Sequence, residues 1–221
     1  MTLRSADLRH FVLRRLHSLS GIVPIGAFLL IHLYTNYQAV GPGGPARFDE
    51  EVRHLQENPL VVWAEILGIG LPIAFHAFYG LFLAGEGRWN TGRYRYGANW
   101  RYVFQRVSGV LLLFFIGYHV WMTRLRTVVA PELFTDNHGH VSFSYMSEYL
   151  QSAHFGVPTW ALYVVGVSAA TLHLANGLWG FLIHWGVTTG PRAQRLSALA
   201  CAGLGVGLTA FGLTSLFAFV I

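Results

Sequence analysis

The sequence predicts an all-α integral membrane protein with five transmembrane helices. Its 221 residues are 53% hydrophobic and only 11% charged, whereas soluble domains carry about 25% charged residues. Five apolar stretches are long enough to cross a bilayer core, which takes about 20 helical residues. They cover approximately residues 16–37, 59–85, 102–123, 157–186 and 196–221. We therefore expect a single transmembrane domain over residues 1–221, with helices one to four forming a bundle.

The first apolar stretch is expected to be a retained helix, although Arg14 and Arg15 precede it as basic residues precede a secretory signal. It is longer than the apolar core of a signal peptide, which spans about 7–15 residues. It also contains His32 and lacks a cleavage site of small residues. The chain therefore keeps this segment as its first transmembrane helix.

Three further segments have local signals. Residues 41–45, GPGGP, predict a flexible outer loop, and residues 143–153 predict a short helix on the outer surface. The run GLGVGL at 203–208 resembles a dinucleotide-binding loop, but no strand precedes it inside this apolar helix. Close helix packing through Gly203 and Gly207 is the better interpretation.

The distribution of arginine predicts the orientation, because the chain contains no lysine. Eleven arginines precede the first helix or lie in the connections between helices two and three and between helices four and five: Arg4, Arg9, Arg14, Arg15, Arg88, Arg93, Arg95, Arg101, Arg106, Arg192 and Arg195. The other side has four, together with most of the acidic residues. The arginine-rich side should face the cytoplasm. We expect a multi-pass protein of the cell membrane, with its amino terminus inside and its carboxyl terminus outside.

Histidines inside the apolar helices are the main functional signal. A polar imidazole in hydrocarbon costs free energy unless another group satisfies it. At a rise of 1.5 Å per residue, His32 and His119 lie roughly 25 Å and 20 Å from the nearest inner arginines. His76 and His173 lie roughly 17–18 Å from the inner surface by the same measure. The sequence therefore predicts two pairs at two depths, each pair drawn from two helices.

Two imidazoles that face each other across a helix bundle can supply both axial ligands of a b-type haem. Gly80 and Gly177 follow His76 and His173 by four residues, so that a flat macrocycle could approach the backbone there. Those glycines could equally serve helix packing alone. Zinc fits less well because it prefers clustered tetrahedral ligands. Cys201 is the only cysteine, which excludes a disulfide and a covalent c-type haem. The first four helices are thus expected to form a haem-binding bundle with two haems.

Seven motifs along most of the chain resemble one family, the dihaem cytochrome b anchor subunits of succinate:quinone oxidoreductases of the single-anchor, five-helix type. The motifs are RRLHSLSG (14–21), IHLYTN (31–36), FHAFYG (75–80), QRVSG (105–109), GYHVWMTR (117–124), LHLANGLWGF (172–181) and TGPRAQR (189–195).

The resemblance implies that His76 and His173 ligate an inner haem b and that His32 and His119 ligate an outer one. It also implies an iron–sulfur subunit bound at the cytoplasmic face and a flavoprotein subunit with FAD. Electrons would pass from succinate to a quinone, which in dihaem members is usually menaquinone. The succinate site would lie on another subunit.

Several polar residues are candidates for secondary roles. The propionates of the inner haem need donors, and the candidates are His17, Ser18, Arg106 and His184. His184 could instead be an interfacial histidine that reaches water. The loop histidines, His54, His138, His140 and His154, are expected to be solvated.

Glu65 is the candidate for proton or quinone chemistry. It precedes His76 by 11 residues, which predicts a shared helix face and a carboxylate roughly 16 Å further out. A carboxylate at that depth is costly unless it is hydrogen-bonded or protonated. A hydrogen bond to backbone or water near the helix start is the alternative. The resemblance implies an acidic residue near the outer haem at the quinone site, for which Asp49 and Glu50 are rivals.

One position departs from part of the family. Some fumarate-reducing relatives place a glutamate two residues before the inner ligand on helix four, where this chain has Thr171. Succinate oxidation with quinone reduction is therefore the favoured direction. Two other interpretations remain at this point: the cytochrome b anchor of a nitrate reductase or hydrogenase, and a histidine-dependent membrane transporter.

Overall fold

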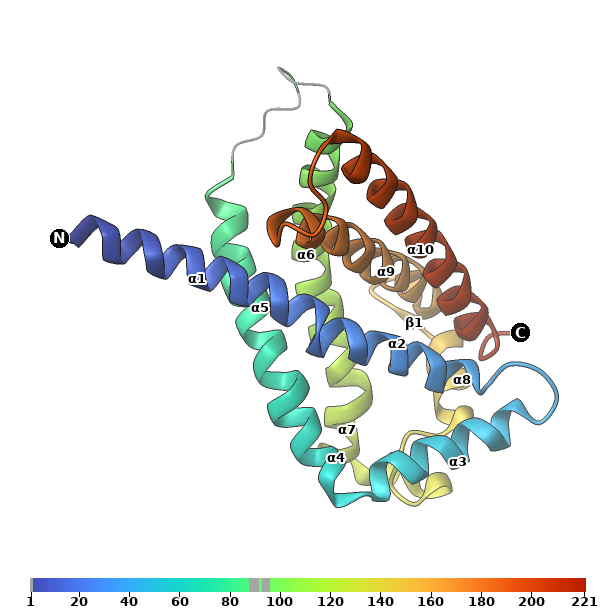
Figure 1. Cartoon of the computed structure of the whole chain (residues 1–221). Helices are drawn as coiled ribbons and strands as arrows, with labels where there is room; N and C mark the ends of the chain where they lie inside the picture. The colour runs from blue at the N-terminus through green and yellow to red at the C-terminus, as the bar shows by residue number, and fades with distance from the viewer. Residues whose placement is uncertain (1, 88–91, 93–95) are drawn as a thin grey trace.

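A computed structural model describes residues 2–87, 92 and 96–221, without the side chains of residues 2–6 and of Thr135. In that part of the chain, five helical segments are long and apolar enough to cross a membrane (Figure 1). They are Asp7–Tyr37, Pro59–Gly85, Gly97–Val129, Thr159–His184 and Pro191–Phe217. The all-α membrane fold with five spans is thereby confirmed. The first and third spans are longer than predicted, because the helices continue through polar residues at their ends.

The first span consists of α1 (Thr2–Ile22) and α2 (Pro24–Tyr37). The two helices meet at Val23, directly before Pro24. Proline has no backbone N–H and crowds the carbonyl four residues earlier, which interrupts a helix. The break therefore follows from the sequence, and it separates His17 on α1 from His32 on α2.

The second and third spans each contain a π-helical stretch. Their successive elements are α4 (Pro59–Trp63), η1 (Ala64–Gly70) and α5 (Leu71–Gly85), then α6 (Gly97–Val120), η2 (Trp121–Leu125) and α7 (Arg126–Val129). π-Helical turns are rare and occur often at functional sites. Here η1 contains Glu65 and η2 contains Arg124.

The last two spans, α9 (Thr159–His184) and α10 (Pro191–Phe217), pack along each other (Figure 1). A Cβ atom at Gly205 would lie 2.9 Å from Ala175 Cβ, and one at Gly212 would lie 2.7 Å from Val167 Cγ1. A Cβ atom at Gly203 or Gly207 would meet nothing within 4 Å. The predicted packing through Gly203 and Gly207 is therefore wrong: two residues turn a helix by about 200°, which places them away from α9.

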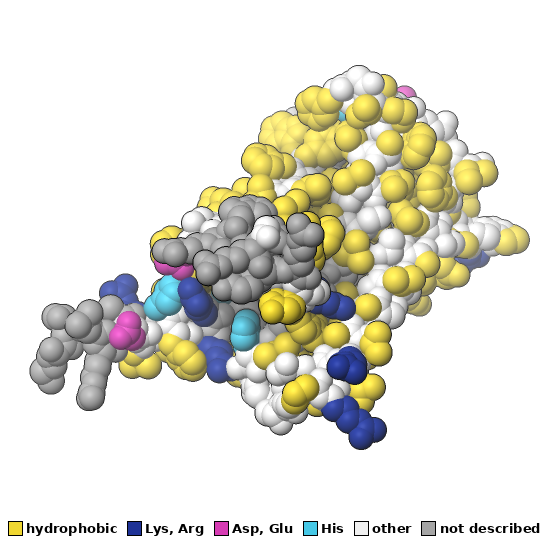
Figure 2. Space-filling view, turned by 90° about the horizontal axis from the view of Figure 1, so that it is seen from above, with side chains coloured by type: hydrophobic (Ala, Val, Ile, Leu, Met, Phe, Trp, Pro, Cys, Tyr) yellow, Lys and Arg dark blue, Asp and Glu magenta, His cyan; other side chains and the backbone are white. Residues whose placement is uncertain are grey.

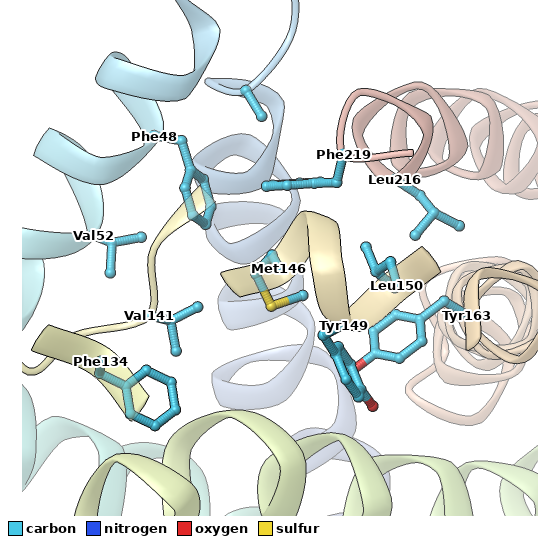
Figure 3. Packing of buried hydrophobic residues seen from close by; sticks show 11 residues of the cluster. Phe48, Val52, Phe134, Val141, Met146, Tyr149, Leu150, Tyr163, Leu216 and Phe219 are labelled. Atoms are coloured by element: carbon cyan, nitrogen blue, oxygen red, sulfur yellow. The ribbon is translucent and has the colours of Figure 1, made fainter. Parts of the chain in front are cut away.

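The connecting segments at one end of the spans fold into a unit that we call the cap. It contains α3 (Gly44–Glu57), the 3₁₀ helix η3 (Pro131–Asn137), α8 (Phe143–Gln151) and the short antiparallel strands β1 (Ala153–His154) and β2 (Val157–Pro158). Their buried hydrophobic side chains pack against the ends of α9 and α10 (Figure 3). The labelled members are Phe48, Val52, Phe134, Val141, Met146, Tyr149, Leu150, Tyr163, Leu216 and Phe219. The predicted helix at 143–153 is present as α8.

The predicted flexible loop at 41–45 is instead well held within the cap. Gly44 already begins α3. Arg47 folds back over the turn and donates hydrogen bonds to the carbonyls of Pro42 and Val40, at 2.6 and 2.7 Å. The glycines that suggested flexibility serve the turn, because Gly41 and Gly43 have φ values of 81° and 72°.

The surface of the spans is apolar, as lipid contact requires. Large hydrophobic side chains such as Phe78, Phe104, Phe114 and Val206 are exposed. Figure 2 views the end opposite the cap and shows hydrophobic side chains over much of the face, with most of the arginine and histidine side chains in the lower part of the view. This distribution of apolar and basic side chains is typical of a membrane protein with one basic end.

Candidate functional site

Four histidines inside the spans form two pairs. The rings of His76 on α5 and His173 on α9 lie 6.2 Å apart between centroids, with planes at 81°. The rings of His32 on α2 and His119 on α6 lie 5.6 Å apart, with planes at 74°. These are the two pairs that depth predicts from the sequence. We call them the inner pair and the outer pair.

His76 has its Nδ1 atom held by the first span. Nδ1 lies 3.0 Å from the main-chain carbonyl oxygen of His17, so that it must be the protonated nitrogen. The His17 ring stacks on the His76 ring, with centroids 4.1 Å apart and planes within 8°. Ser20 Oγ also lies 3.4 Å from the same Nδ1. The tautomer leaves a free lone pair on Nε2, which is what a metal ligand needs.

His173 is held in the same tautomer by the third span. Its Nδ1 atom lies 2.9 Å from Ser108 Oγ, whose own hydrogen goes to the carbonyl of Phe104. Its Nε2 atom accepts from Gln105 Nε2 at 3.1 Å. Gln105 is fixed in turn by Asn176, whose Nδ2 atom lies 2.8 Å from Gln105 Oε1. Nδ1 is thus the donor and Nε2 the acceptor.

The outer pair follows the same pattern. His119 Nδ1 lies 3.0 Å from the hydroxyl oxygen of Tyr163 on α9. His32 Nε2 lies 3.4 Å from Asn36 Nδ2, an amide donor, which again makes Nε2 the acceptor. In all four histidines the contacts are compatible with a lone pair on Nε2.

The two pairs fit a metal with two axial imidazoles. Two metal–imidazole bonds of about 2 Å each, plus the distance from each ring centre to its nitrogen, approach the observed ring separations. A Cβ atom at Gly21 would lie 2.5 Å from His76 Cε1, and one at Gly109 would lie 3.1 Å from His173 Cε1. The two rings of the inner pair therefore pack directly against backbone that carries no side chain.

Zinc is a poorer fit. Within the described ranges, no three histidine, cysteine or acidic side chains gather in a way that could hold a metal ion. Zinc prefers such clusters. Two separate imidazole pairs match the axial ligation of haem.

The comparison with known proteins identifies the family. No protein-family model matches the chain. Over 213 residues, however, it is 38% identical to the succinate dehydrogenase cytochrome b558 subunit of Bacillus subtilis (strain 168). The match covers 96% of this chain and 98% of that protein. The chain belongs to the family of succinate dehydrogenase cytochrome b subunits. It is therefore a membrane subunit of an oxidoreductase, and the predicted resemblance is confirmed.

In this cytochrome b subunit, Gly80 and Gly177 lie next to residues that contact the inner pair, not next to the paired rings themselves. A Cβ atom at Gly80 would lie 3.0 Å from His17 Nε2, and one at Gly177 would lie 3.2 Å from Gln105 Nε2. Gly21 and Gly109 are closer to the inner-pair rings themselves. All four glycines line the surroundings of the inner pair.

The candidates for propionate contacts lie in different settings. His17 stacks on His76, while Ser18 is half-buried on the same helix. Arg106 donates to the carbonyl of Leu83 at 2.9 Å, near the end of α5, and its guanidinium lies 3.9 Å from the centre of the Tyr102 ring. His184 is the last residue of α9 and is exposed. Of these residues, only His17 directly contacts the inner pair among the described contacts.

Glu65 forms an ion pair inside the membrane spans. Its Oε2 atom lies 2.8 Å from Nη2 and 2.9 Å from Nε of Arg124. The predicted alternative, a hydrogen bond to backbone or water, does not describe this contact. The prediction of a helix face shared with His76 assumes an ideal α-helix, whereas Glu65 lies within the π-helical stretch η1. That argument therefore does not apply to this segment.

The rival acidic residues lie in the cap. Asp49 Oδ1 accepts a hydrogen bond from the backbone N–H of Phe143 at 2.6 Å, which ties α3 to the start of α8. Burial raises the pKa of Asp49, although this hydrogen bond acts in the opposite direction. Glu50 is exposed. Asp49 thus has a structural contact that Glu50 lacks among the described interactions.

Thr171 presents a buried hydroxyl two residues before His173. Its Oγ1 atom lies 2.7 Å from Thr209 Oγ1 on α10, and both hydroxyls also contact carbonyls of their own helices. The side chain is fully buried. This position therefore joins two helices and provides no titratable carboxyl group.

The residues that hold the rings of the two pairs are not evident from the sequence. Gln105, Ser108 and Gly109 all lie in the motif QRVSG, so the motif contained a signal that was not used for this purpose. Tyr163 lies outside all seven motifs, and no spacing in the sequence points to it.

Proposed function

We propose that this subunit binds two haem b groups and passes electrons between an iron–sulfur subunit and a membrane quinone. The observation that carries the proposal is the pairing of four intramembrane histidines from four different spans. His76 and His173 would hold the inner haem, and His32 and His119 the outer haem. The printed name of the Bacillus subtilis relative, a cytochrome b558, supports haem binding.

The residues of the chain have clear tasks in this arrangement. Haem supplies reversible one-electron chemistry when it is bound. The four helices that bear the histidines hold each pair of imidazoles at a fixed separation. Hydrogen bonds at Nδ1 of His76, His173 and His119 would fix the tautomer and the ring orientation and raise the basicity of the ligand. The apolar spans exclude water from the surroundings of both pairs.

The subunit would assemble with its partners at the arginine-rich end. The positive-inside rule places that end, with the amino terminus, in the cytoplasm and the carboxyl terminus outside. An iron–sulfur subunit would dock there and would itself bind a flavoprotein that carries FAD. The name of the relative, a succinate dehydrogenase subunit, supports a succinate-oxidising complex.

Quinone chemistry is assigned to the outer part of the spans. Glu65 is the favoured residue, because its carboxylate lies within a membrane span, is partly accessible and uses only Oε2 in the contacts with Arg124. We propose menaquinone as the substrate and quinone reduction as the favoured direction. Thr171 supports that direction, because it offers no carboxyl group for a compensating proton route.

Purification of the complex provides the test. The subunit should co-purify with a flavoprotein and an iron–sulfur subunit, and its absorption spectrum should show b-type haem. Succinate should reduce that haem, and added menaquinone analogue should reoxidise it. A purified complex without haem, or haem that succinate cannot reduce, would contradict the proposal. Co-purification with a nitrate reductase or hydrogenase instead would assign the chain to another complex.

A further inference from the structure

The outer-pair histidine His119 has a phenol as its hydrogen-bond partner. Its Nδ1 atom lies 3.0 Å from the hydroxyl oxygen of Tyr163. Tyr163 comes from α9, 44 residues further along the chain, and only 5% of its surface is exposed. The contact therefore joins the third and fourth spans beside the outer pair.

Packing fixes the Tyr163 ring from two sides. The Phe115 ring contacts it edge-on at 5.3 Å, and the Tyr149 ring of α8 does so at 5.9 Å. Figure 3 shows Tyr149 and Tyr163 next to each other within the buried cluster of the cap. A phenol held in this way presents its oxygen to His119 without rearrangement.

The direction of the hydrogen bond follows from ligation. A histidine that binds a metal through Nε2 carries its proton on Nδ1. His119 must then donate from Nδ1, and the Tyr163 oxygen must accept. A hydrogen bond in the opposite direction would require the proton on Nε2, where it would block the ligand atom.

The inner pair provides a comparison within the same molecule. His76 donates to a main-chain carbonyl, which no side-chain substitution removes. His173 donates to Ser108 Oγ at 2.9 Å. Tyr163 and Ser108 are therefore matched hydroxyl acceptors, one at each pair.

We infer that Tyr163 is a positioning residue that orients His119 and lowers the midpoint potential of the outer haem. The inference rests on the proposed function, in which His119 is an axial ligand. An acceptor at Nδ1 makes the imidazole a stronger electron donor, and a stronger donor favours oxidised iron over reduced iron. Tyr163 thus acts on the outer haem through His119.

The test is a redox titration of the whole complex that carries Tyr163→Phe. Phenylalanine keeps the packing of the ring and removes the hydroxyl that accepts from His119. At a fixed ambient potential, the ratio of reduced to oxidised outer haem should rise several-fold, where a tenfold change corresponds to 59 mV for one electron. The inner haem should keep its potential. Ser108→Ala should give the converse result, a shift of the inner haem alone.

Two further variants separate a positioning role from a structural one. Tyr149→Phe keeps the Tyr163 acceptor and removes only the hydroxyl that interacts with it, so it should shift the outer-haem potential less than Tyr163→Phe does. Replacement of Tyr163 by 3-fluorotyrosine keeps the hydroxyl but weakens it as an acceptor, so the shift should be smaller and in the same direction. This variant also provides the measurement if Tyr163→Phe does not assemble.

The outcomes distinguish the inference from the proposed function. Unchanged potentials in Tyr163→Phe and in the 3-fluorotyrosine variant, with both haems bound, would overturn the role of Tyr163. Equal shifts of both haems would overturn it too. If His119→Ala retains both haems, the ligand assignment fails first. If His119→Ala loses the outer haem and the Tyr163 variants have no effect, only this inference fails.

Discussion

Arg124 and Glu65 form an ion pair between the third and second membrane spans, with Arg124 Nη2 2.8 Å from Glu65 Oε2. Each residue comes from a π-helical stretch of its span. Removal of one partner of such a pair leaves an uncompensated charge in poorly hydrated surroundings. The pair therefore joins the two spans and compensates the charge of Glu65.

Glu65→Gln is expected to keep both haems and to slow quinone turnover. The amide retains much of the shape of the side chain but transfers no proton, and loss of such a group costs roughly 10²-fold or more in rate. Succinate-driven reduction of the haems should stay intact, since it does not involve Glu65. Pre-steady-state reduction and steady-state quinone assays would measure the two steps separately.

Glu132→Gln, at an exposed position in the cap, is the matched control for that substitution. Asp49→Asn and Glu50→Gln test the rival assignments. Unchanged quinone kinetics in Glu65→Gln, with a loss in Asp49→Asn or Glu50→Gln, would move the quinone site into the cap.

Gly21→Ala should remove the inner haem selectively. The new Cβ atom would lie 2.5 Å from His76 Cε1, so the ligand ring would have to move. Haem quantitation should show one haem per subunit, with the spectrum of the outer haem unchanged. Gly203→Ala is the control, because its Cβ atom would meet nothing within 4 Å. Two haems of normal spectrum in Gly21→Ala would show that the ring does not need this space.

The stability of the cap should depend on the ionisation of Asp136. Hydrogen bonds from the hydroxyls of Ser144 and Ser142 hold the pKa of Asp136 below its ordinary value of 3.8. A lowered pKa in the folded state stabilises the fold above pH 3.8, and this contribution is lost as the pH falls through the folded-state pKa. Asp136→Asn should therefore lower the unfolding temperature slightly at pH 7.

The same difference should shrink as the pH falls below 3.8, because the carboxyl group becomes protonated in the wild-type chain as well. Thermal unfolding of the purified subunit in detergent, followed by tryptophan fluorescence at several pH values, would measure it. The effect should be small, since Asp136 is exposed. A difference that grows in acid would contradict the assignment.

Charge reversal at Arg93 and Arg95 should weaken attachment of the soluble subunits. Both residues lie outside the described part of the structure, in the predicted inner connection between helices two and three. The substitutions Arg93→Glu and Arg95→Glu should lower the amount of flavoprotein that co-purifies, with haem content unchanged. Arg53→Glu, in the cap at the other end, should have no such effect. Attachment that survives the double reversal at low salt would exclude this connection as an important contact.

The sequence predicts the parts of this protein that depend on position along the helices. Five apolar stretches give the spans, and a constant rise per residue gives the depth of each histidine, which is enough to pair His32 with His119 and His76 with His173. The sequence does not predict contacts that depend on how one helix is rotated about its axis relative to another. The packing of α10 through Gly205 and Gly212 is of this kind.

Contacts between residues far apart in the sequence could not be predicted either. Arg124 lies 59 residues from Glu65, and Tyr163 lies 44 residues from His119. No hydrophobic periodicity in the sequence links residues at such separations, so neither contact could be predicted from it. The π-helical stretches η1 and η2 also have no composition that separates them from ordinary apolar helix, although they decide where Glu65 and Arg124 point.

Haem content after single replacement of the four histidines tests the central claim most directly. Each of His76→Ala and His173→Ala should leave one haem per subunit, with the spectrum and potential of the outer haem. Each of His32→Ala and His119→Ala should leave one haem with the properties of the inner haem. Two haems retained in any of the four variants, or loss of the other pair's haem alone, would contradict the assignment of two bis-histidine sites.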